Sequence, residues 1–339
     1  MLGLRISFSL SIGCLLALGV GCLTPVAPSP RPTRPAVITS VEGTWVRGTA
    51  MPTARSEIAA AVVDGRIYVA GGLDATGRPL TAFEVYYPAT DIWKGAAPLP
   101  VTLHHLGVAA AGGRVYVTGG YDDDFTPDVN AAWAYSPATD TWAPIADMPA
   151  PRAAHAMVAI DGKLYVVGGV GPDPTALWVY DPATDAWGTS RAPLPTAREH
   201  LSAAAVDGRL YVIGGRWSDR GNLPTVEVYD PATDFWSSGQ DMPTPRGGLT
   251  AAALAGRIHV TGGEAFSPRR TFGQHEVYDV ATDTWTTLAD LPTPRHGLAS
   301  VAVDGRWYVI GGGNEAGLSV SDVLEIFVLA TVFLPWVTH

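Results

Sequence analysis

A pair of adjacent glycines recurs six times along the chain at nearly constant intervals. The pairs begin at positions 71, 119, 168, 214, 262 and 311, so the successive steps are 48, 49, 46, 48 and 49 residues. A period of this length is typical of proteins that build one supersecondary unit per repeat and join the units into an array. The repeat therefore restricts the chain of 339 residues to a repeat architecture.

Each repeat carries the marks of four short strands. Seven residues before each glycine pair lies a two-residue turn, such as Asp64-Gly65, with apolar runs on both sides, which predicts a β-hairpin. In the first five repeats a third strand ends in tyrosine, a turn such as DPATD follows, and a fourth strand contains tryptophan. Four strands in each of six repeats predict an all-β, six-bladed propeller.

The glycine pair, the tyrosine and the spaced tryptophan together resemble the kelch repeat. These markers recur in register over residues 43–328. The resemblance implies a six-bladed kelch propeller over residues 36–328, followed by a C-terminal tail over residues 329–339.

The ring is expected to close through the N-terminal strand. The sixth repeat lacks the ending with tyrosine, turn and tryptophan, whereas Trp45 precedes the first repeat. Trp45 lies 10 residues before Arg55, and the fourth-strand tryptophans lie 10 or 11 residues before the equivalent positions. Residues 43–48 are therefore predicted to complete blade six, which removes an open sheet edge. The alternative closing residue is Trp336, although no PATD turn precedes it.

The N-terminus reads as an export signal. Arg5 is followed by an apolar run over residues 6–21, which predicts a signal peptide over residues 1–21. The run ends in LGVGC, which resembles a bacterial lipobox with Cys22 as the lipidated residue; ordinary cleavage is the alternative. The proline-rich residues 22–35 would form a stiff spacer. The protein is thus expected in the cell envelope or outside the cell, and on a membrane only through a lipid at Cys22.

Charge and cysteine usage exclude several classes of protein. The net charge is −10, and residues 36–339 carry −13 because the first 35 residues contribute three arginines and no acid. An acidic body argues against nucleic-acid binding, which needs basic patches. The only cysteines are Cys14 and Cys22, so the body has no disulfide, no thiolate metal site and no cysteine nucleophile. This also sets aside the copper-radical kelch oxidases, whose cofactor needs a crosslinked cysteine.

Strand order predicts which face of the propeller binds ligands. The loops after the glycine pairs share a face with the starts of the first strands, and they differ in every blade, as loops that carry function do. The opposite face carries the short, nearly identical DG and PATD turns. The candidate residues in the variable loops are Tyr121, Arg216, Trp217, Glu264 and Arg269.

A column of arginines marks the starts of the first strands. Sixteen residues before the glycine pairs lie Arg55, Leu103, Arg152, Arg198, Arg246 and Arg295. The arginines are interpreted as structural, either capping backbone carbonyls or pairing with a glutamate column. That column consists of Glu84, Glu227, Glu276 and Glu325.

The positions that follow this column do not repeat, and histidines gather there. Five of the eight histidines fall in this zone. The resemblance to kelch proteins that bind at the channel mouth implies that such positions line a pocket. The candidates are Glu57, His104, His105, His155, Glu199, His200 and His296.

Two functions remain open at this point. The first is an exported module that binds a protein or a carbohydrate through the variable face, as a monomer and without a cofactor. The second is a sugar epimerase or mutarotase resembling the kelch-type N-acetylneuraminate epimerases, in which Glu57, Glu199, His105 and His200 would supply acid–base groups. No metal site is expected, because the run Asp122–Asp124 lacks the alternation of a calcium loop and no zinc-binding spacing is present.

Overall fold

The computed structural model of the protein describes residues 42–330 except 124, 127 and 128. The predicted signal peptide, the spacer with Cys22 and residues 331–339 lie outside the described residues. Within the described part, no helix is long and apolar enough to cross a membrane.

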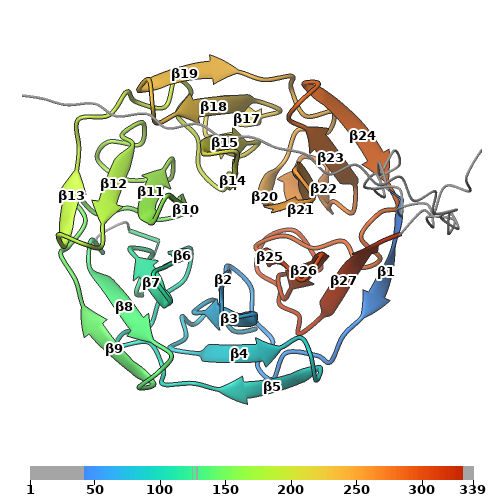
Figure 1. Ribbon diagram of the computed structural model, residues 1–339. Helices are drawn as coiled ribbons and strands as arrows, with labels where there is room; N and C mark the ends of the chain where they lie inside the picture. The colour runs from blue at the N-terminus through green and yellow to red at the C-terminus, as the bar shows by residue number, and fades with distance from the viewer. Residues whose placement is uncertain (1–41, 124, 127–128, 331–339) are drawn as a thin grey trace, which may run out of the picture. The chain divides into compact units, whose positions relative to one another are not determined.

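Six antiparallel sheets surround a central axis as the blades of a propeller (Figure 1), which confirms the predicted fold. The innermost strands are β2 (Ala59–Val63), β6 (Gly107–Ala111), β10 (Ala156–Ile160), β14 (Ser202–Val206), β20 (Gly247–Leu254) and β25 (Ala299–Val303). The second strands are β3 (Arg66–Ala70), β7 (Arg114–Thr118), β11 (Lys163–Val167), β15 (Arg209–Ile213), β21 (Arg257–Phe266) and β26 (Arg306–Ile310).

The two outer positions of each blade follow the same order. The third strands are β4 (Phe83–Tyr87), β8 (Ala132–Ser136), β12 (Trp178–Asp181), β18 (Val226–Asp230), β23 (His275–Asp279) and β27 (Leu324–Leu329). The outermost strands are β5 (Ile92–Gly95), β9 (Thr141–Pro144), β13 (Ala186–Gly188), β19 (Phe235–Ser238), β24 (Thr284–Leu288) and β1 (Gly43–Arg47). The loops of blades four and five contain three further short strands: β16 (Arg216–Trp217), β17 (Gly221–Asn222) and β22 (Arg269–Thr271).

The first and last strands of the propeller close it. Strand β1 pairs with β27 so that Gly43 lies opposite Leu329 and Arg47 opposite Glu325. The Trp45 ring packs 5.2 Å from the Phe327 ring, and its Nε1 donates a hydrogen bond of 2.8 Å to the carbonyl of Ala289 in blade five. The predicted closure through Trp45 is confirmed, and the alternative through Trp336 is wrong because β1 occupies the outer edge of β27.

Apolar residues hold neighbouring blades together. Six clusters of buried side chains each join residues of two adjacent blades, so the core is a ring of interfaces rather than one central mass. The repeated spacing of tyrosine, aspartate and tryptophan adds hydrogen bonds across the same interfaces. In blade one, Tyr86 Oη donates to Asp91, Asp91 accepts the Thr49 amide, and Trp93 Nε1 donates to the Thr49 carbonyl.

The arginine column uses both of the interactions considered from the sequence. All five guanidinium groups are buried, and in four blades each pairs with its column glutamate: Arg55 with Glu84, Arg198 with Glu227, Arg246 with Glu276 and Arg295 with Glu325. Arg152 has no such partner. It donates to the carbonyls of Gly168 and Ala176 and lies 3.8 Å from the centre of the Trp178 ring, which replaces the glutamate.

Candidate functional site

A closed ring of backbone hydrogen bonds surrounds the channel mouth. It involves one residue per blade, two positions after the arginine column, and each amide donates to the carbonyl of the previous blade over 2.7–3.1 Å. The members are Glu57, His105, Ala154, His200, Gly248 and Gly297. The ring fixes the spacing of the six blades where they approach the axis most closely.

Every member of this ring has a left-handed backbone. The φ angles of Glu57, His105 and His200 are 54°, 55° and 50°. Glycine adopts this conformation without cost, whereas another residue loses roughly 1–3 kcal/mol, and such strain gathers at functional sites. Ala154 bears the same strain with only a methyl group, but the other three non-glycine residues carry metal-ligating or acid–base side chains.

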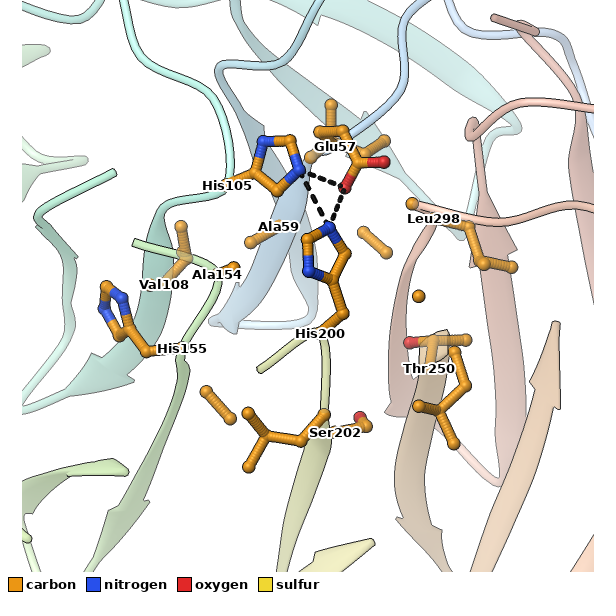
Figure 2. Close-up of a pocket in the computed structure, with 18 of the residues that line it drawn as sticks. Glu57, Ala59, His105, Val108, Ala154, His155, His200, Ser202, Thr250 and Leu298 are labelled. Atoms are coloured by element: carbon orange, nitrogen blue, oxygen red, sulfur yellow. Dashed lines mark hydrogen bonds and ion pairs between the residues drawn. The ribbon is translucent and has the colours of Figure 1, made fainter. Parts of the chain in front are cut away.

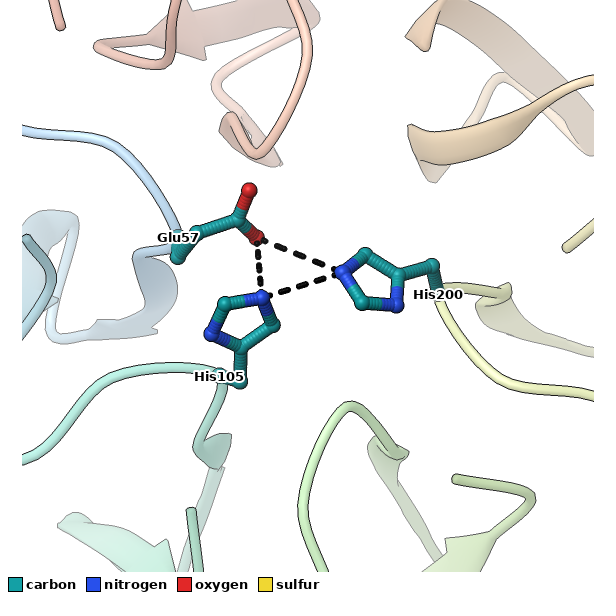
Figure 3. Close-up of side chains that lie close together, drawn as sticks. All are labelled: Glu57, His105 and His200. Carbon is teal, nitrogen blue, oxygen red and sulfur yellow. Dashed lines mark hydrogen bonds and ion pairs between the residues drawn. The ribbon is translucent and has the colours of Figure 1, made fainter. Parts of the chain in front are cut away.

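These three side chains converge on one point above the channel (Figure 3). Nε2 of His105 lies 3.2 Å from Oε2 of Glu57 and 3.0 Å from Nε2 of His200. Nε2 of His200 lies 3.9 Å from the same Glu57 oxygen. We call Glu57, His105 and His200 the mouth triad. The triad joins the neighbouring blades one and two to blade four, which lies across the axis from blade one.

A second layer of polar groups holds the triad. His200 Nδ1 contacts Oε2 of Glu199, and the other Glu199 oxygen accepts a hydrogen bond of 2.8 Å from Arg216 Nε. Arg216 Nη1 also donates to Glu264 over 2.6 Å. On the other side, Nδ1 of His105 lies 2.6 Å from Nδ1 of His104. One guanidinium thus links two carboxylates, and one of these carboxylates orients a triad histidine.

The triad imidazoles are uncharged near neutral pH. Burial, reinforced by the charge of Arg216, lowers the pKa of His105 to about 3 and lowers the pKa of His200 well below its usual range. Burial and neighbouring His105 lower the pKa of His104 to about 3. A neutral imidazole has one protonated nitrogen and one lone pair. In the tautomer with its proton on Nδ1, beside Glu199, His200 directs the lone pair of Nε2 at the triad.

The triad separates two cavities. Above it, a mouth pocket of about 250 Å³ has a polar floor and an apolar rim. Its lining consists of Ser56, Glu57, His105, His200, Arg216, Glu264, His296 and Gly317, with Leu73, Phe125, Phe266 and Leu318 at the rim. Below it, an axial cavity of about 160 Å³ is lined by small side chains such as Ala59, Ser202 and Thr250 (Figure 2).

A second groove of about 460 Å³ adjoins the mouth pocket. It lies beside the β16–β17 hairpin and shares Arg216 and Phe266 with the mouth pocket. Trp217 lines this groove rather than the pocket itself. The two concavities therefore meet at Arg216 and Phe266.

The structure brings most of the residues predicted from the sequence to the mouth. Glu199 lies behind the pocket, where it accepts a hydrogen bond from Arg216. The predicted residues that line the pocket itself are Glu57, His105, His200, Arg216, Glu264 and His296. His296 Nε2 lies 3.6 Å from both Glu57 and Glu264. His104 and Tyr121 are buried behind His105, with the Tyr121 ring 5.4 Å from the His105 ring.

His155 and Arg269 also lie outside the lining of the mouth pocket. His155 is buried beside the axial cavity, where its Nε2 lies 3.1 Å from Thr118 Oγ1. Arg269 donates to the carbonyl of Ala316 and ties the loops of blades five and six together.

Sequence reasoning missed two of the apolar rim residues, Phe125 and Leu318, which are 67% and 56% exposed. The third exposed rim residue, Phe266, is 56% exposed and lies at the end of β21 in blade five. The sequence signal that could have identified Phe125 and Leu318 is an apolar residue within a loop that is otherwise polar. A single exposed apolar residue is common on protein surfaces, so that signal alone did not distinguish them.

Comparisons with known proteins agree on the fold. The model of the KLHDC2/KLHL20/DRC7 Kelch-repeats domain matches residues 38–169, 92–240 and 154–337, which together span most of the chain. No curated protein matches the sequence. A solved structure titled "Structure of YjhT" is similar with a TM-score of 0.69 at 18% identity, over 81% of this chain and 96% of that one. The chain belongs to the Kelch-repeat family of β-propellers.

Proposed function

We propose that this Kelch propeller binds a small polyhydroxylated ligand, a carbohydrate, in the mouth pocket. The observation that carries the proposal is the arrangement of Arg216 between Glu199 and Glu264, directly beside the exposed Phe266 ring. The Arg216 guanidinium lies 5.2 Å from the centre of that ring. A fixed array of charged groups thus adjoins an aromatic surface that water covers in the free protein.

This combination suits the two surfaces of a sugar. Hydroxyl groups form hydrogen bonds with carboxylates and guanidinium groups, and bonds to charged partners contribute more than bonds between neutral groups. The C–H face of a pyranose packs on an aromatic ring, as other apolar groups do. Phe125 and Phe266 provide such rings on the rim of the pocket.

The size of the pocket favours a small ligand over a protein. Its volume of about 250 Å³ lies just below the usual range for small-molecule sites, which begins at about 300 Å³. A stable protein partner would instead cover a broad surface, about 800 Å² on each side. The polar floor lies at the bottom of the pocket, where a protein partner could reach it with only one side chain at a time.

A glycan array followed by calorimetry tests the proposal with the full-length protein. We expect Phe266→Ala to weaken binding of the selected carbohydrate about tenfold, which equals about 1.4 kcal/mol. Phe235→Ala is the matched control, because Phe235 is 66% exposed in β19 and does not line the mouth pocket. An equal loss in both variants, or a ligand that leaves Phe266→Ala unaffected, would exclude the mouth pocket as the binding site.

A second candidate function is acid–base isomerisation of the bound sugar. The observation that favours it is the distance of 3.2 Å between the Glu57 carboxylate and His105 Nε2, at the floor of the pocket. Mutarotation needs a base that takes the anomeric O–H proton and an acid that protonates the ring oxygen as the C–O bond opens. NMR exchange rates with N-acetylneuraminate and common hexoses test this, and Glu57→Gln should abolish any acceleration.

We further propose that the propeller is exported and held on a membrane surface by a lipid at Cys22. The support is the order of Arg5, the apolar residues 6–21 and Cys22, followed by a proline-rich spacer. Radiolabelled palmitate should enter the wild-type protein in a bacterial host and fail to enter Cys22→Ser. Equal labelling of the two proteins would rule out Cys22 as the acylated residue.

A further inference from the structure

We propose that the mouth triad is a binding site for a divalent transition-metal ion of the zinc class, held by Glu57 Oε2, His105 Nε2 and His200 Nε2. The inference does not depend on the proposed carbohydrate ligand, because the three atoms form the floor beneath the space where a sugar would lie.

The spacing of the three atoms fits a four-coordinate ion. Zinc bonds to imidazole and carboxylate measure about 2.0–2.2 Å, so two ligands of a tetrahedral ion lie about 3.3–3.6 Å apart. The three distances between the triad atoms are 3.0, 3.2 and 3.9 Å. Small side-chain movements would therefore place all three atoms around one ion.

The lone pairs point inward because the far nitrogens have partners. His200 Nδ1 contacts the Glu199 carboxylate, and a proton held on that nitrogen leaves the lone pair of the neutral ring on Nε2. Metal-bound histidines usually make this kind of contact with a carboxylate. His105 Nδ1 faces His104 Nδ1 at 2.6 Å, and a proton between them on His105 likewise leaves its Nε2 free. Three electron-pair donors then face one another, and a cation removes their repulsion.

One alternative distribution of protons exists. If the shared proton stays on His104, then His105 Nε2 carries its own proton and donates it to Glu57 or His200. The triad would then be a hydrogen-bonded cluster without a metal. Titration with Zn²⁺ distinguishes a triad that binds a metal ion from a hydrogen-bonded cluster that does not.

The local charge also favours a cation. Glu57, Glu199 and Glu264 surround the site, and Arg216 is the guanidinium that pairs with two of them. Three carboxylates and one guanidinium give a formal net charge of minus two. Each of these groups is at least partly withdrawn from water, so the imbalance is screened less than on an open surface. An ion of charge plus two balances it.

The backbone supports the same assignment. Glycine would relieve the left-handed strain at all six ring positions, yet the triad positions hold Glu57, His105 and His200. Gly297, the neighbour of Glu57 in the ring, has no side chain, and a Cβ there would lie 2.4 Å from Oε1 of Glu57. The ring therefore makes room for the carboxylate and orients it toward the histidines. The three protein ligands leave a fourth position for water or a substrate oxygen, as in catalytic His₂Glu zinc sites.

Calorimetric titration of the chelator-treated full-length protein with Zn²⁺ tests the proposal. We expect one ion per chain, and we expect Co²⁺ at the same site to give the visible absorption of a four-coordinate ion. His105→Ala with His200→Ala should remove this binding. Glu199→Gln should weaken it about 10–100-fold, as loss of a second-layer partner does. His155→Ala, a buried histidine outside the triad, is the matched control and should retain full binding.

Two results would overturn the proposal: no binding of Zn²⁺ or Co²⁺ by the wild-type protein, or unchanged binding by the double histidine variant. Glu57→Gln guards against loss of the fold, since it keeps the shape of the side chain and removes its charge; it should weaken Zn²⁺ binding while the thermal unfolding curve remains cooperative. Because no carbohydrate is present in these titrations, failure of the metal site leaves the proposed function standing, and the reverse also holds.

Discussion

The Nε2 atoms of His105 and His200 lie 3.0 Å apart, although 95 residues separate them in the chain. His105 follows the fourth strand of blade one and His200 follows that of blade three, so each side chain enters the mouth at the start of the next blade. Only a closed ring brings these two positions together. The triad that they form with Glu57 is therefore a product of the complete propeller rather than of any single repeat.

Weakening the contacts of the closing strand β1 should lower the stability of the whole propeller. Trp45→Ala removes the contacts with Phe327 and Trp307 and the hydrogen bond to Ala289. We expect a loss of about 2–3 kcal/mol, below the usual range for a fully buried tryptophan because Trp45 is half-buried. Urea unfolding measures the change. Trp336→Ala should leave the midpoint unchanged, and a larger effect there than at Trp45 would contradict the observed closure.

The buried arginines should differ according to their partners. Arg198→Ala leaves the Glu227 carboxylate buried without its ion pair, which costs about 3–5 kcal/mol. Arg152→Ala leaves only backbone carbonyls without a donor, and we expect about 1–3 kcal/mol. Replacing both partners, Arg198→Met with Glu227→Leu, should recover most of the loss. Chemical denaturation of the four proteins checks the order, and equal losses in the two single variants would disprove it.

Gly297 should control the site through steric contact alone. Gly297→Ala places a methyl group against both oxygens of Glu57 and forces alanine into a left-handed backbone, which costs about 1–2 kcal/mol. Gly248→Ala is the matched control: its φ is 69°, and the nearest atom to its added methyl group lies 3.5 Å away. Both variants should lose similar stability, but only Gly297→Ala should weaken Zn²⁺ binding in calorimetric titrations. Equal binding by the two variants would show that the carboxylate position does not matter.

Acid should destabilise the fold through a histidine pair far from the mouth. His259 and His275 are buried among Trp45, Trp307 and Phe327, with 2.9 Å between His259 Nδ1 and His275 Nε2. Burial, reinforced by Arg257, lowers the pKa of His259 to about 4. Burial, reinforced by His259 and Arg246, lowers the pKa of His275 to about 3, although a hydrogen bond to Ala289 opposes this shift.

The unfolded chain then binds more protons than the folded one below pH about 6.5, so stability falls as the pH drops from there toward 4. Each histidine contributes up to about 1.4 kcal/mol per pH unit. His259→Phe should reduce the slope of the unfolding free energy against pH by up to about 1.4 kcal/mol per pH unit, because the other buried histidines still titrate. The same slope in the variant and the wild type would show that the pair does not titrate with unfolding.

The repeating pattern was sufficient to predict the fold. Hairpins depend on local chemistry, and Asp64-Gly65 adopts the left-handed pair of conformations that a tight β-turn requires. The spacing of Trp45 was enough to identify the closing strand. Trp45 lies at the distance from Arg55 that the fourth-strand tryptophans keep, and blade six is the blade whose own repeat lacks a fourth strand. The face that carries the variable loops follows from strand order alone.

The resemblance to kelch proteins predicted that Glu57, His105 and His200 share one opening, but only the tertiary structure determined how closely their side chains meet. Each of Glu57, His105 and His200 comes from a different repeat, so their separation depends on the angle between blades and on the ring of backbone hydrogen bonds around the axis. Their left-handed backbones were not predictable, since glutamate and histidine rarely adopt that conformation. The sequence therefore determined the local strands and turns, whose causes lie within a few residues. The contacts across the channel required the closed ring, because the residues involved are neighbours in space alone.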